Sequence, residues 1–168
     1  PTPPPSGLLP IPDYSGDLWE RKALLGDLWG SRTSLAEAGV QFGVSWSNTL
    51  QSVVSGGRDN VTEIGGAEDY NLTLDLMRMN LVPGGLVTLR AESRYGESVN
   101  TDTGSLLPAS TDMFFPLTST PDESVPIALT TLTYTQFFSD SFAVFVGKFD
   151  TLDGDLNEFA SGRGLTQF

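Results

Sequence analysis

Long runs with a two-residue period occupy the sequence from residue 40 onward and limit the chain to a β fold. In the first run, Val40 to Trp46, apolar side chains alternate with small or polar ones. Because successive side chains of a strand point to opposite faces of a sheet, this period predicts strands with one apolar and one polar face. Four further runs cover residues 69–76, 86–95, 127–138 and 142–150. The sequence therefore predicts an all-β, antiparallel fold.

The connections between these runs alternate in length. Residues 77–85 and 139–141 are short connections, whereas residues 55–66 and 96–126 are long ones. Transmembrane β-barrels alternate in this way, because their turns on one side of the membrane are short and their loops on the other are long. The strands built on these runs are expected to be about 9–15 residues long, enough for a tilted strand to cross a bilayer, which takes about 9–11.

The chain before residue 40 has no two-residue period. Six prolines within residues 1–15 predict an extended, Pro-rich tail. Residues 16–39 are predicted to hold two short helices. In the first, Asp17 is a suitable N-cap for a helix over 18–25, and Gly26 is a suitable stop.

The second short helix is predicted over 32–38, and it ends at Gly39. Trp19 and Trp29 occur in a repeated Gly-Asp-Leu-Trp stretch. We expect these two rings to dock the helices on an apolar surface.

Composition excludes several classes of function. The chain has no Cys and no His, so thiol nucleophiles, disulfides, Cys/His zinc sites and Ser-His-Asp triads are excluded. A net charge of −12 argues against a nucleic-acid partner, because a phosphate-binding surface needs clustered Lys and Arg. We expect no enzymatic activity, no cofactor and no metal.

Charged side chains gather on one face of two neighbouring predicted strands. Arg90, Glu92 and Arg94 follow one another at two-residue spacing, so they share a face. The preceding strand carries Asn71, Thr73 and Asp75 at the same spacing, and the short turn between the strands predicts antiparallel pairing. The two polar faces then form one surface, opposite a surface of Leu, Val and Tyr.

Two tyrosines are predicted near the loop ends of their strands. Tyr70 begins one alternating run and Tyr95 ends the next. Aromatic side chains at these positions are typical of the interface between a membrane and water. The phase of the last two strands remains ambiguous, because both faces of residues 142–147 are apolar.

A longer stretch resembles a known family. Residues 26–42 read Gly-Asp-Leu-Trp-Gly-Ser-Arg-Thr-Ser-Leu-Ala-Glu-Ala-Gly-Val-Gln-Phe and resemble the opening signature of the carbohydrate-selective porin (OprB) family of bacterial outer membranes. Shorter matches follow in the same order. They are Leu-Thr-Leu-Asp-Leu at 72–76, Pro-Gly-Gly at 83–85 and Gly-Lys-Phe-Asp at 147–150. The resemblance covers residues 16–168.

The resemblance implies a transmembrane barrel of about sixteen strands, the size at which a water-filled channel is left open. It implies passive, carbohydrate-selective diffusion of small sugars through the outer membrane of a Gram-negative cell. Its partners would be the lipid bilayer, lipopolysaccharide and, in a homo-oligomer, further copies. Because five strands are too few to close a barrel, residues 40–168 would be the first strands and loops of a longer porin.

Within this interpretation, six polar residues are candidates to line the channel and bind sugar. They are Arg90, Glu92, Arg94, Asp75, Asn71 and Thr73. Arg and carboxylate groups suit this role because each exchanges hydrogen bonds with several sugar hydroxyls.

Two other interpretations fit the same pattern. The first is a soluble, secreted carbohydrate-binding β-sandwich, in which the apolar face is core and the polar face meets water. The second is a non-conducting structural subunit of a larger assembly.

Overall fold

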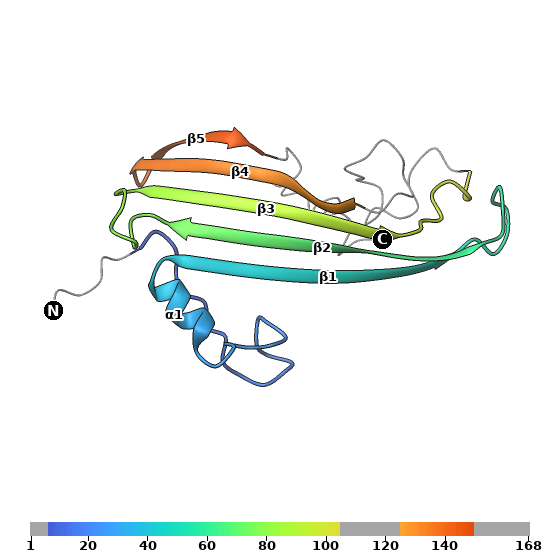
Figure 1. Cartoon of the computed structure of the whole chain (residues 1–168), viewed down its shortest axis with the longest axis horizontal. Helices are drawn as coiled ribbons and strands as arrows, with labels where there is room; N and C mark the ends of the chain where they lie inside the picture. Colours follow the sequence, from blue (N-terminus) through green and yellow to red (C-terminus); the bar gives the residue numbers. More distant parts are fainter. Residues whose placement is uncertain (1–6, 105–124, 150–168) are drawn as a thin grey trace. The chain divides into compact units, whose positions relative to one another are not determined.

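The computed structural model describes residues 7–104 and 125–149. Five strands form one antiparallel sheet in the order β1-β2-β3-β4-β5, preceded by one short helix (Figure 1). The elements are α1 Ser31–Glu37, β1 Val40–Ser52, β2 Thr62–Asp75, β3 Gly85–Gly96, β4 Val125–Ser139 and β5 Phe142–Lys148. The mostly β architecture and the five strands are thus confirmed, and the sheet is not closed into a barrel in this chain.

The chain divides into two compact units, and each of the first four strands contributes residues to both. Unit 1 comprises Pro1–Gly43, Asn71–Leu89 and Thr131–Lys148. Unit 2 comprises Val44–Tyr70, Arg90–Thr130 and Phe149–Phe168. Parts of three predicted segments, residues 1–6, 105–124 and 150–168, lie outside the described residues.

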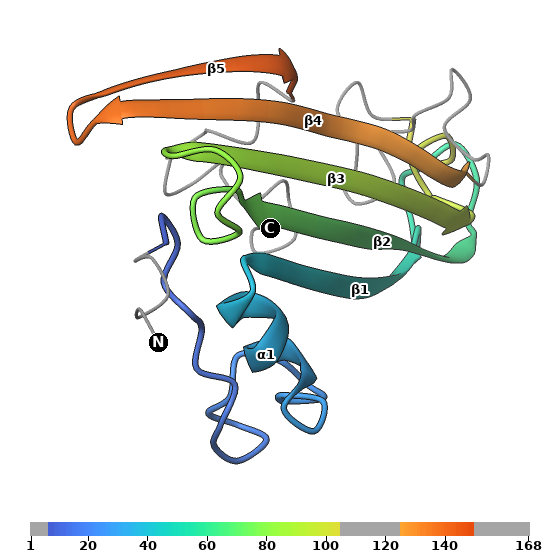
Figure 2. The ribbon, with the colours of Figure 1, turned by 60° about the vertical axis from the view of Figure 1, so that its left-hand side comes forward.

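In unit 1, the helix predicted over 18–25 is wrong, because these residues form turns and bends (Figure 2). Asp17 does cap the first turn, since its Oδ1 accepts the N–H of Trp19 at 2.8 Å and of Glu20 at 3.2 Å. The turn does not propagate, and the Arg21 side chain donates to the Leu24 carbonyl instead. Leu24 is exposed, so no packing offsets the cost of nucleating a helix.

The second predicted helix is confirmed as α1, one residue earlier than expected. Asp27 holds its first turn, accepting the backbone N–H of Thr33 at 2.8 Å and its hydroxyl at 2.9 Å. The preceding loop ends in the left-handed residue Gly30, with φ of 88°. Trp19 and Trp29 are 92 % and 100 % exposed, so the expected docking of these rings is absent within the described part of the chain.

In unit 2, β2 begins at Thr62, inside the segment predicted as the loop 55–66. Gly65 and Gly66, which favour a loop in the sequence, are buried strand residues. A Cβ on Gly66 would lie 2.5 Å from the Ser47 carbonyl oxygen and 2.4 Å from the Tyr95 hydroxyl. Glycine is therefore required at position 66, because the neighbouring strands approach it too closely for a side chain. Close approach of another backbone is one of the reasons for which strands contain glycine.

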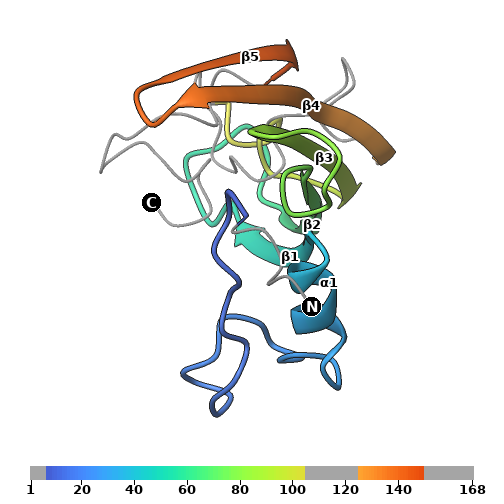
Figure 3. The same cartoon turned by 90° about the vertical axis from the view of Figure 1, so that its left-hand side faces the viewer.

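β4 and β5 form an antiparallel hairpin (Figure 3), and its register shows which residues of the two strands share a face. Tyr134 lies opposite Val146, Gln136 lies opposite Val144, and Leu132 lies opposite Lys148. These even-numbered residues share one face of the hairpin, and Thr133, Thr135 and Phe145 share the other. All of β5 is exposed, so neither face of this strand is covered.

Burial is inverted relative to an ordinary soluble domain. Within residues 7–104 and 125–149, the buried apolar residues are small or medium in size: Ala36, Val53, Ala67, Ala91 and Val99. Among the described residues, the largest fully buried side chains are Glu92 and Asp75. Exposed residues include the large apolar side chains Trp46, Ile64, Phe138, Phe142, Phe145 and Val146. Soluble proteins bury their aromatic and aliphatic side chains and leave carboxylates in water, so this sheet has the opposite preference.

No helix among the described residues is both long enough and apolar enough to span a membrane.

Candidate functional site

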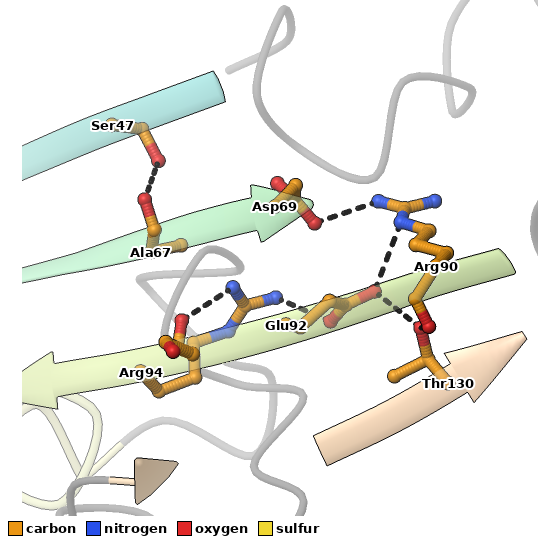
Figure 4. Close-up of polar contacts among 8 residues, drawn as sticks. Ser47, Ala67, Asp69, Arg90, Glu92, Arg94 and Thr130 are labelled. Atoms are coloured by element: carbon orange, nitrogen blue, oxygen red, sulfur yellow. Dashed lines mark hydrogen bonds and ion pairs between the residues drawn. The ribbon is translucent and has the colours of Figure 1, made fainter. Parts of the chain in front are cut away.

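The polar face of unit 2 carries a row of paired charges, here called the ionic ladder (Figure 4). The Arg90 guanidinium joins Asp69 Oδ1 at 2.9 Å and Glu92 Oε1 at 3.2 Å. Arg94 Nη2 reaches the other oxygen of Glu92, Oε2, at 3.0 Å. Thr130 of β4 donates its hydroxyl to Glu92 Oε1 at 3.2 Å. The ladder therefore joins three adjacent strands through side chains as well as through the backbone.

Strand geometry explains why the sequence builds this ladder. Arg90, Glu92 and Arg94 alternate along β3 with Ala91 and Ser93, so the three charged groups point to the same face. The predicted clustering of these three residues is thus confirmed by their contacts. Like charges do not touch, because the carboxylate of Glu92 lies between the two guanidinium groups.

The ladder is buried and balanced in charge. Glu92 is 1 % exposed and Arg94 is 7 % exposed, and buried ions are tolerated only where they are paired and hydrogen-bonded. Two arginines face two carboxylates, so the ladder carries no net charge. Arg94 also donates from Nη1 to the Ser93 carbonyl at 3.3 Å. Its buried Nε makes no hydrogen bond within the described residues.

The structure assigns the remaining candidates differently. Asp69, which the sequence analysis did not select, pairs with Arg90. Asp75 belongs to unit 1 and pairs with Arg78 at 3.8 Å, so it is not a neighbour in the ladder. Asn71 is exposed and Thr73 is half-buried in unit 1, and neither side chain has a hydrogen-bond partner among the described residues.

Two members of the ladder were therefore missed. Asp69 precedes Asn71 by two residues, and the two-residue period alone places it on the polar face of β2. That period was a sufficient signal for Asp69. Thr130 gives no comparable signal, because its contact with Glu92 spans 38 positions of the chain.

The opposite face of unit 2 carries a hydrogen-bonded aromatic group. The Trp46 indole N–H donates to the Tyr95 hydroxyl, which in turn donates to Asn48 Oδ1 at 2.6 Å. Tyr95 lies next to the end of β3, as expected. Tyr70 instead lies well inside β2, because that strand begins earlier than the sequence pattern indicated.

Tyr95→Phe is expected to lower the free energy of unfolding by about 1 kcal/mol, because the substitution removes hydrogen bonds to Trp46 and Asn48. Denaturant unfolding in one fixed detergent measures this change. Trp46 emission reports the local loss in a background where Trp19 and Trp29, both exposed, are replaced by Phe. Tyr14→Phe is the matched control, and an equal effect of both substitutions would contradict the assignment.

No cluster of three metal-ligating side chains occurs in residues 7–104 and 125–149. No family model, curated protein or solved structure matches the chain. The geometry of the polar and apolar faces is therefore the basis for a functional proposal.

Proposed function

We propose that this sheet is the first part of an outer-membrane porin of the carbohydrate-selective type. Its polar face would line a water-filled passage for small sugars, and its apolar face would contact lipid. The observation that carries the proposal is the inverted burial, with Glu92 and Arg94 sheltered while Phe138, Phe142 and Phe145 are exposed. In a bilayer this arrangement is favourable, because hydrocarbon accepts the aromatic side chains and excludes the ions.

Strand length supports the same proposal. β1, β2, β3 and β4 contain 13, 14, 12 and 15 residues, whereas strands of globular proteins most often have about 5–6. A bilayer crossing at a tilt needs about 9–11 residues. The edges of β1 and β5 would be paired by further strands of the porin, because lipid does not tolerate open sheet edges.

Passage of sugar through such a channel involves no covalent step. A sugar hydroxyl accepts hydrogen bonds from guanidinium groups and donates them to carboxylates. The ionic ladder places both kinds of group on the face proposed to line the passage, and Arg90, the most exposed of its charged groups, is the first that a passing sugar would meet. Because the ladder is neutral in sum, this part of the wall does not select against uncharged solutes.

The full-length gene product in proteoliposomes tests the proposal. We expect vesicle swelling in small neutral sugars and discrete conductance steps in planar bilayers. A protein that stays monodisperse in buffer without detergent and opens no channel would contradict the proposal and favour the soluble β-sandwich. Assembly without conductance would favour the non-conducting structural subunit.

Arg94→Gln is expected to reduce sugar flux and to shift the reversal potential toward cation selectivity, because it removes one positive charge from the passage wall. Gel mobility before and after heating verifies that the variant assembles. Arg58→Gln, at an exposed position in the loop before β2, is the matched charge control. If the two variants have the same flux and the same reversal potential, Arg94 has no role in permeation.

A further inference from the structure

The first described residues of unit 1 are tied to the sheet. The Leu9 N–H donates to Asp75 Oδ2 at 3.1 Å, and Arg78 Nη2 donates to the Leu9 carbonyl at 2.7 Å. The Gln41 side chain donates to the Pro10 carbonyl at 2.9 Å. Residues 7–10 therefore lie beside the β2–β3 connection (Figures 1 and 2), so this part of the predicted Pro-rich tail is held against the sheet.

These contacts lie on the polar face of the strands. Gln41 stands between the apolar residues Val40 and Phe42 in β1, and Asp75 ends the polar series of β2. Counting by two along β2 connects Asp75 with Thr73 and Asn71. The segment 7–10 thus lies at one end of the face that the proposed function places in water.

Asp75 is the centre of this attachment. It is 2 % exposed, although aspartate is rarely buried without partners. Its Oδ1 accepts the Arg78 N–H at 2.9 Å, and its own N–H donates to the Gly39 carbonyl at 2.7 Å. One side chain therefore joins the segment 7–10 to the β2–β3 turn, and its backbone joins that turn to the start of β1.

The segment also lies close to the two side chains that hold it. A Cβ on Gly7 would lie 2.5 Å from Asp75 Oδ2 and 2.4 Å from Arg78 Nε. Real Cβ atoms do not approach their neighbours so closely, so a side chain at position 7 would have to move the Asp75 carboxylate and the Arg78 guanidinium, and with them the contacts that hold Leu9. This position offers a way to release the segment while the strands remain unaltered.

We propose that residues 7–10 are a built-in constriction of the passage, at the end of the sheet that carries the β2–β3 turn. Asp75 is the positioning residue that holds them there. This inference rests on the proposed function, because a segment fixed at one end of the polar face narrows a channel only if that face lines one. The segment would then limit the size of the sugar that passes.

The test compares single-channel conductance of the full-length protein with that of Gly7→Val, Asp75→Ala and Asp75→Asn. Gly7→Val and Asp75→Ala are expected to raise conductance about twofold, because conductance follows the open cross-section at the narrowest point. Asp75→Asn keeps one acceptor oxygen, so we expect partial rescue. A sugar too large for the wild-type channel should enter through the two released variants.

A reversible disulfide between the segment 7–10 and β1 distinguishes a constriction of the passage from a general destabilisation of the protein. The chain has no Cys, so Pro10→Cys with Gln41→Cys introduces the only thiol pair. The pair is placed in the Asp75→Ala background, where the segment is released. There we expect wild-type conductance after oxidation and the raised value after reduction, and Pro10→Cys alone in that background should be insensitive to redox conditions. If the wild-type protein opens channels, but neither Gly7→Val nor reduction of the Cys pair changes the conductance, this inference alone is overturned. A wild-type protein that opens no channel would overturn the proposed function and the constriction with it.

Discussion

Glu92→Gln is expected to lower the free energy of unfolding by about 3–5 kcal/mol, the cost of breaking a buried ion pair by neutralising one partner. Glu92 contacts Arg90, Arg94 and Thr130. Without its charge, the buried Arg94 guanidinium loses its carboxylate partner, and the half-buried Arg90 guanidinium keeps Asp69. Denaturant unfolding in a fixed detergent, read by circular dichroism, measures the difference.

Glu97→Gln provides the matched control for this prediction. Glu97 follows β3 directly, belongs to the same unit and is exposed. The same loss of charge there should change stability by less than about 0.5 kcal/mol, as at other surface positions. If the two variants unfold at the same denaturant concentration with the same m-value, the ladder does not stabilise the folded sheet.

Gly84→Ala is expected to destabilise the protein by about 2–5 kcal/mol, because left-handed backbone and steric overlap both penalise the new methyl group. Gly84 has φ of +72°, and a Cβ there would lie 2.3 Å from the Phe137 carbonyl oxygen. The Gly84 carbonyl also accepts the Phe137 N–H at 2.8 Å. The turn therefore cannot move away without losing its bond to β4.

Substitutions at two other glycines distinguish the cost of the left-handed backbone from the cost of the steric overlap. Gly30 has φ of +88° with nothing within 4 Å of an added Cβ, so Gly30→Ala should cost only about 1–2 kcal/mol. Gly43 in β1 has neither the positive φ nor a close neighbour, and Gly43→Ala should be neutral or slightly stabilising. A Gly84→Ala variant no less stable than Gly30→Ala would show that the overlap with Phe137 is relieved at no cost.

Most of the sheet could be predicted from the sequence, because strand alternation is a local signal. The start of β2 could not, since paired glycines such as Gly65 and Gly66 are common in loops, and the need for glycine at position 66 depends on Ser47 and Tyr95 in the neighbouring strands. The helix over 18–25 failed for a related reason. A good N-cap at Asp17 starts a turn, but only tertiary packing would have sustained a helix.

The candidate site was predictable to the same extent. The row Arg90, Glu92 and Arg94 follows from the period of a single strand. The choice between Asp69 and Asp75 as the partner of Arg90 depends on register, which alternation alone does not fix. The role of Asp75 depends on Leu9, 66 positions away, and no local pattern indicates such a contact.

The order of strands in the sheet is also their order in the chain. Every strand therefore pairs with its immediate predecessor, which gives the sheet a low contact order and keeps each closure step inexpensive in entropy. The β2–β3 and β4–β5 hairpins, which have the two short turns, can form first. The free backbone groups at the edge of each formed strand can then pair with the next strand. Such a sheet can grow progressively from one side, without any segment having to thread past another.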